Sequence, residues 1–100
     1  MIKTKADAKR ALGDVSPEFV FYVCNGEVLK NLDELAKVLK RMDDAAYEYH
    51  VNAEKNDFSS WIKDITGDDK LAKDIYSKDR KTALSIVNLR IKDLKKRAKE

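Results

Sequence analysis

The chain has one cysteine, one proline and three glycines in 100 residues, and these shortages already exclude several classes of protein. A single cysteine, Cys24, rules out a disulfide within the chain, which is typical of proteins of the reducing cytoplasm. The longest wholly apolar run, residues 19–24, is far shorter than the ~20 residues of a membrane-spanning helix. No apolar segment of a signal peptide follows the basic N-terminus. We therefore expect a cytoplasmic protein that makes no membrane contact.

Charge is what the chain has in abundance. Charged residues make up 39% of it, with 21 basic and 18 acidic side chains and a formal net charge of +3. An average globular chain has about 25% charged residues, so this balanced excess predicts a helical surface crossed by ion pairs. A net charge of +3 is too small to diagnose nucleic-acid binding. The length and the 43% of hydrophobic residues predict one domain over residues 1–100.

One stretch has the period of a β-strand. Aromatic and β-branched residues occupy both faces of residues 19–24, and Asn25-Gly26 favours a type I′ turn after which residues 27–29 return as a second strand. A two-stranded ribbon is marginal alone, so we expect helices to cover one face. The other face is a candidate patch for a protein partner, formed by Val20, Tyr22 and Leu29.

The rest of the chain has the period of helices. Capping residues predict helix starts at Thr4, Asn31, Asp43 or Asp44, Asn56 or Asp57, Asp68 or Asp69, and Ser77 or Asp79. The spacing of Phe58, Trp61 and Ile62 is that of a committed core face. The last helix has heptad spacing for only about two repeats, which predicts a monomer or a weak homodimer. We expect an α+β fold that is mostly α, a small bundle of about five helices with one N-terminal β-hairpin.

Six short blocks stand out along the chain: residues 21–26, residues 31–35, residues 49–52, residues 56–62, Gly67-Asp68 and Leu71-Ala72. Taken in this order, they resemble a family of small prokaryotic, mostly archaeal, domains of unknown function. The resemblance covers roughly residues 19–72. It implies a compact domain whose signature is Tyr-His-Val-Asn at residues 49–52 followed by Asn-Asp-Phe-Ser-Ser-Trp-Ile at residues 56–62, and it implies no reaction or ligand.

The candidate site centres on His50, because imidazole can serve as a base, a metal ligand or a switch near neutral pH. We expect His50 to pack against Tyr47 and Trp61 and to hydrogen-bond a helix cap such as Asp57. Polar groups at such a corner commonly satisfy the amides of helix ends. The alternative is a small polar pocket for a ligand, a peptide terminus or another partner. The candidate residues are His50, Asn52, Asn56, Asp57 and Trp61.

Other chemistry has little support in the sequence. One histidine and one cysteine make no metal-ligand spacing, so we expect no metal site. There is no nucleophile elbow, no P-loop and no glycine-rich dinucleotide motif, so we expect neither a catalytic nucleophile nor a bound cofactor.

Basic side chains gather at both ends of the chain. Basic residues near a helix C-terminus are usually a solvated tail that the helix dipole favours. If the two ends converge, they form a phosphate-binding patch with strong salt dependence, although interleaved aromatics for single-strand stacking are absent. The candidates for nucleic acid are Arg90, Lys92, Lys95, Lys96, Arg97 and Lys99, with Lys3, Lys5, Lys9 and Arg10 at the other end.

Three functions follow from these features. The leading hypothesis is a non-catalytic protein-interaction or adaptor module that uses the hairpin. The second is weak, sequence-independent nucleic-acid binding through the last helix. The third is a small-molecule sensor or enzyme centred on His50.

Overall fold

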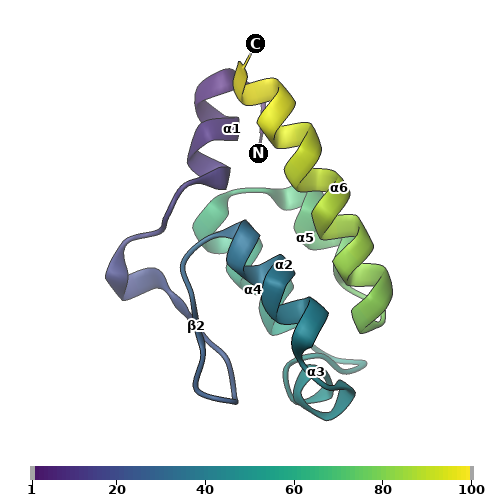
Figure 1. Ribbon diagram of the computed structural model, residues 1–100. Helices are drawn as coiled ribbons and strands as arrows, with labels where there is room; N and C mark the ends of the chain where they lie inside the picture. The colour runs from purple at the N-terminus through teal and green to yellow at the C-terminus, as the bar shows by residue number, and fades with distance from the viewer. Residues whose placement is uncertain (1, 100) are drawn as a thin grey trace.

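The computed structural model describes residues 2–99, which form six α-helices, a 3-10 helix, a π-helix and one hairpin (Figure 1). The predicted α+β fold, mostly helical with an N-terminal hairpin, is confirmed, with six α-helices in place of about five. The elements in chain order are α1 (Lys5–Leu12), η1 (Pro17–Phe19), β1 (Phe21–Tyr22), β2 (Val28–Leu29), α2 (Leu32–Arg41), α3 (Asp44–His50), α4 (Asp57–Trp61), η2 (Ile62–Thr66), α5 (Asp69–Ile75) and α6 (Arg80–Lys99).

Side-chain caps explain where the α-helices begin. Each of the six follows a residue whose side chain accepts a hydrogen bond from the amide three residues further on. The first turn of a helix leaves its amides without partners in the helix, and these caps satisfy one of them. Every cap is one of the residues predicted from the sequence. They are Thr4, Asn31, Asp43, Asn56, Asp68 and Asp79.

The turn of the hairpin differs from the prediction. The Gly26 amide donates to the Val23 carbonyl over 2.9 Å, and the Val23 amide donates to the Glu27 carbonyl over 2.8 Å. Gly26 has a φ of +94°, whereas no residue other than glycine has a positive φ among the described residues. A type I′ turn needs a positive φ at Asn25 as well, so that prediction is wrong. The strands are joined instead by a turn over residues 24–26 that ends in the left-handed Gly26.

Helix α6 is the longest helix and packs against three of the other α-helices. It packs along α1, α2 and α5, and Figure 1 shows its C-terminal end beside α1, whereas α3 and the hairpin turn lie beyond its other end. The small side chains of Ala8 and Ala11 are fully buried on α1, which lets the two helices approach closely. The two ends of the chain are therefore brought together, although they lie at opposite ends of the sequence.

A second part of the core lies under the hairpin. The Phe21 ring stacks on the Phe58 ring at 4.9 Å and meets the edge of Trp61 at 6.0 Å between centroids. The Trp61 indole N–H donates to the Phe19 carbonyl over 2.7 Å. Burial of Phe58, Trp61 and Ile62 confirms the predicted core face of this segment. These contacts attach the hairpin to α4, so its inner face is covered.

Candidate functional site

His50 ends α3 and has hydrogen-bond partners on both ring nitrogens. Its Nε2 accepts a hydrogen bond from the Cys24 amide at 3.0 Å, and its Nδ1 lies 3.0 Å from an Asp57 carboxylate oxygen. A main-chain amide can only donate, so Nε2 must be unprotonated and Nδ1 carries the proton. The His50 side chain is 5% exposed. The imidazole thus connects the hairpin turn to α4.

The rings around His50 are not all those predicted. The Phe21 and Phe58 rings lie 5.2 Å from the imidazole between centroids, and the Tyr49 ring lies 5.0 Å from it. The predicted hydrogen bond to Asp57 is present. Tyr47 stacks on Phe58 and Trp61 meets Phe21, so the two predicted neighbours belong to the same aromatic cluster. The hairpin adds Phe21, which contacts His50 although the two residues lie far apart in the sequence.

The two asparagines of this corner serve the main chain. The Asn52 side-chain carbonyl accepts hydrogen bonds from the amides of Glu54 and Lys55, which closes the turn between α3 and α4. The buried Asn56 side chain caps α4, and its NH₂ group donates to the carbonyls of Ile75 and Tyr76 at the end of α5. Asn56 therefore provides hydrogen-bond partners both for an amide at the start of α4 and for carbonyls at the end of α5.

Asp57 opens α4 and accepts hydrogen bonds from two side chains. Its carboxylate oxygen lies 3.0 Å from His50 Nδ1 and 3.1 Å from Lys55 Nζ. Partial burial alone would raise the pKa of Asp57, but the hydrogen bonds and charge from His50 and Lys55 outweigh it and hold the pKa below its ordinary value. The ionised form of Asp57 is therefore the one that fits the folded protein.

This lowered pKa predicts a loss of stability in acid. Asp57 binds its proton more readily when the chain is unfolded, so its contribution is complete above the ordinary aspartate pKa of about 4 and is lost as the pH falls further. In urea unfolding from pH 7 to pH 3, we expect Asp57→Asn to flatten the acid decline. Asp64→Asn, which removes an exposed carboxylate on η2, is the control and should leave the decline unchanged. Equal slopes for Asp57→Asn and wild type would contradict this assignment.

Of the five candidate residues, the structure joins His50 and Asp57 directly by a hydrogen bond. The side chains of Asn52, Asn56 and Trp61 bond instead to main-chain groups of other residues. His50, Asn56 and Trp61 are buried, and among the described residues no buried side-chain nitrogen or oxygen lacks a partner. A cavity of about 500 Å³ lies on the other side of α3, and Asn52 is the one candidate residue that borders it. His50 does not border this cavity, and both of its ring nitrogens have partners among the described residues.

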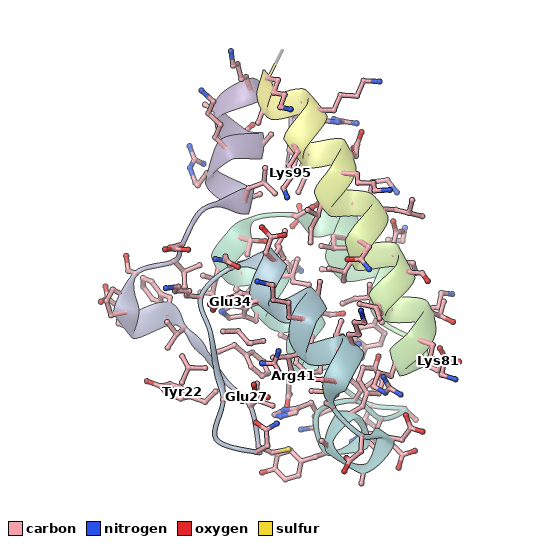
Figure 2. The ribbon with its side chains drawn as sticks, in the orientation of Figure 1. Tyr22, Glu27, Glu34, Arg41, Lys81 and Lys95 are labelled. Atoms are coloured by element: carbon pink, nitrogen blue, oxygen red, sulfur yellow. The ribbon has the colours of Figure 1, made fainter. Side chains whose placement is uncertain are left out.

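The outer face of the hairpin is exposed, but not as predicted. Tyr22 pairs with Val28 across the hairpin, and their exposed fractions are 71% and 48%. Figure 2 shows Tyr22 on the outer side of the hairpin. The prediction that Leu29 lies on this face is wrong, because Leu29 pairs with Phe21 and is 1% exposed. The turn over residues 24–26 shifts the register, so that Val28 takes the outward position. We define the outer hairpin face as Val20, Tyr22 and Val28, with Val20 partly exposed.

Contacts at its tip hold the hairpin in place. The Glu27 carboxylate accepts hydrogen bonds from the Asn25 side chain and from the Arg41 guanidinium of α2. The hydrogen bond from Arg41 is the main reason that the pKa of Glu27 is lowered, and the bond from Asn25 lowers it further. Figure 2 shows Glu27 and Arg41 facing each other between the hairpin and α2. With the Cys24 amide bound to His50, the turn is attached to two helices.

Arg90 is not a surface residue, which makes its assignment to a nucleic-acid interface wrong. Its guanidinium makes two hydrogen bonds to the Asp68 carboxylate, at 2.7 and 3.0 Å, and a third to Asp93 at 3.0 Å. The Arg90 and Asp68 side chains are 9% and 1% exposed. The hydrogen bond to Asp68 is the main reason that the pKa of Arg90 rises further. Arg90 therefore ties α6 to the start of α5.

The other basic candidates of α6 are exposed. Arg97 lies 3.0 Å from Asp93, and Lys95 lies 3.7 Å from Asp33 of α2, so each is partly neutralised. Lys92, Lys96 and Lys99 face solvent. The convergence on which the sequence argument depended is observed, because α1 packs against this end of α6.

Comparison of the chain with protein-family models, curated proteins and solved structures gives no match. The resemblance to a prokaryotic family therefore stays a prediction. Within residues 2–99, no group of histidine, cysteine and acidic side chains has the arrangement to hold a metal ion. The same residues include no helix with the length and apolar composition needed to cross a bilayer.

Proposed function

We propose that the protein is a non-catalytic docking module whose outer hairpin face binds a partner protein. The observation that carries the proposal is the cross-strand pair of Tyr22 and Val28, two large side chains exposed side by side on a two-stranded sheet. Side chains of a non-hydrogen-bonded antiparallel pair are close together, so they form one surface. Val20 extends this surface along β1.

The contacts that hold the hairpin in place make the Tyr22 and Val28 surface suitable for binding. Phe21, next in sequence to Tyr22, is stacked in the core, and the turn is hydrogen-bonded to His50 and Arg41. A surface held in this way loses little conformational entropy when a partner binds. Tyrosine is also enriched among the residues that dominate binding energy at protein interfaces. The partner that fits is a protein with an apolar surface that accepts the Tyr22 ring.

The internal use of polar groups supports a non-catalytic role. The one histidine has both nitrogens occupied by partners within the chain. Cys24 lies in the hairpin turn, where its thiol is 3.8 Å from the Ala46 carbonyl. The neighbouring imidazole of His50 is bound by the Cys24 main-chain amide and by Asp57, and not by the thiol. A surface that binds without reacting agrees best with these arrangements.

A double variant tests the proposal. Tyr22→Ser with Val28→Ser should weaken partner binding by about 2 kcal/mol or more, roughly thirtyfold in Kd, because a central tyrosine contact is lost. Both side chains are exposed, so stability should change by no more than about 0.5 kcal/mol per site. The measurement is capture from native lysate by wild type and variant at equal concentration, followed by titration of the recovered partner.

Leu89→Ser is the matched control, since Leu89 is 66% exposed on α6 and away from the hairpin. Partners that are lost with the double variant and kept with Leu89→Ser support docking through the hairpin. Equal capture by all three proteins would overturn the proposal. Sedimentation of the wild type distinguishes a partner protein from a second copy of the chain.

A further inference from the structure

Charge is unevenly distributed along this chain, and the fold collects the basic part at one end. Residues 1–12 and 90–100 carry ten basic and three acidic side chains, a net charge of +7, whereas residues 13–89 carry eleven basic and fifteen acidic ones, a net charge of −4. The overall charge of +3 conceals this separation. Because α1 packs on the C-terminal part of α6, both basic segments lie at the same end of the molecule (Figure 1).

A cleft lies between the two basic segments. It has a volume of about 540 Å³ and is lined by Lys3, Thr4, Lys5, Asp93, Lys96 and Arg97, which we call the basic cleft. The only acidic group in the lining, Asp93, accepts a hydrogen bond from Arg90 and forms an ion pair with Arg97, so its charge is compensated. The lysines of the lining have no ion pair among the described residues. The cleft therefore presents uncompensated positive charge from Lys3 and Lys5 at the start of α1 and from Lys96 of α6.

We propose that the basic cleft binds the phosphate backbone of double-stranded nucleic acid. Clustered lysines that neutralise phosphates release the counterions condensed on a duplex, which supplies sequence-independent affinity. Lys92 and Lys99 extend the positive surface beyond the cleft on the solvent side of α6, at spacings of four and three from Lys96. Contacts of this kind are made to consecutive phosphates and do not depend on the base sequence.

Two features favour a duplex over a single strand or a membrane. Binding of single strands relies on aromatic side chains on which bases stack, but the exposed aromatics Phe19, Tyr22, Tyr49 and Tyr76 all lie outside α1 and α6. Binding of a membrane surface by a helix requires an apolar face that is free to insert. The apolar faces of α1 and α6 are buried against each other and against the core.

The test compares two triple variants of the full chain with equal loss of charge. Lys3→Gln, Lys5→Gln and Lys96→Gln remove the cleft lysines. Lys73→Gln, Lys78→Gln and Lys81→Gln remove exposed lysines at or near the other end of α6, where Figure 2 shows Lys81. Each variant is titrated against a fluorescent duplex DNA at salt concentrations from about 50 to about 200 mM, and thermal melting establishes that each is folded.

If each of the four cleft cations contacts one phosphate, the logarithm of the wild-type association constant should fall with the logarithm of the salt concentration with a slope of about −3 to −4. The cleft variant should have a slope of about −1, and the control variant should keep the wild-type slope. Equal loss in both variants would reduce the effect to net charge and overturn the proposal. Absence of duplex binding, tighter binding of single strands, or binding of phosphatidylserine vesicles without DNA would overturn it as well.

Discussion

Replacement of Arg90 by methionine should lower the free energy of unfolding by about 3–5 kcal/mol, as expected when one partner of a buried ion pair is removed. The Asp68 carboxylate is 1% exposed, and Arg90 supplies two of its hydrogen bonds. Without the guanidinium this carboxylate stays buried with the Leu71 amide as its remaining partner. Methionine fills much of the space of the arginine stem, so the loss measures the charge and not a cavity. Urea unfolding followed by circular dichroism gives the value.

Arg97→Met is the matched control for this prediction. Arg97 lies on the same helix and also pairs with Asp93, but its side chain is 48% exposed. Exposed ion pairs contribute about 0–1 kcal/mol, so the control should remain close to wild type. If Arg90→Met lost no more stability than Arg97→Met, the Arg90–Asp68 pair would not hold α6 against α5.

Helix starts were predictable from the sequence because a cap and its amide lie only three residues apart. Thr4, Asn31 and Asn56 each accept the bond that their position suggests. The buried face around Trp61 was predictable for a related reason, since helical spacing places apolar residues on one side. These features depend on the local chain and need no knowledge of distant segments.

Features that join distant segments were not predictable in this way. Arg90 was assigned to the surface because it belongs to a basic run, and nothing local indicates that Asp68, 22 residues away, lies opposite it. The amide of Asn56 reaches the end of α5 for the same reason. A different turn moved Leu29 inward and Val28 outward, because a shift of one residue reverses the faces of a strand.

The candidate site likewise combines a local contact that the sequence predicts with a distant one that it does not. The hydrogen bond of His50 to Asp57, seven residues away, was predicted. The bond from the Cys24 amide was not, because it joins residues 26 positions apart. The convergence of the basic ends depended likewise on the packing of α1 against α6. The sequence shows which segments are basic. The packing of the helices shows which basic side chains lie near one another and which, like Arg90, are neutralised by an ion pair inside the protein.

Truncation of Trp61 to alanine should lower the free energy of unfolding by about 3–5 kcal/mol, a large share of the stability of a small domain. Trp61 is buried, meets the Phe21 ring under the hairpin and donates its indole N–H to the Phe19 carbonyl. Its loss leaves a cavity beneath β1 and a carbonyl without its donor. Because Trp61 is the only tryptophan, far-UV circular dichroism and not fluorescence must follow the unfolding.

Two further variants separate packing from hydrogen bonding. Trp61→Phe keeps most of the ring contact and removes the donor to Phe19, so it should cost about 1–3 kcal/mol and fall between wild type and alanine. Leu89→Ala removes an exposed apolar side chain and should cost no more than about 0.5 kcal/mol. An unfolding curve for Trp61→Ala that coincides with that of Leu89→Ala would contradict the burial of this ring. In that case the hairpin would not be held by α4, and the rigid surface on which the docking proposal depends would be lost with it.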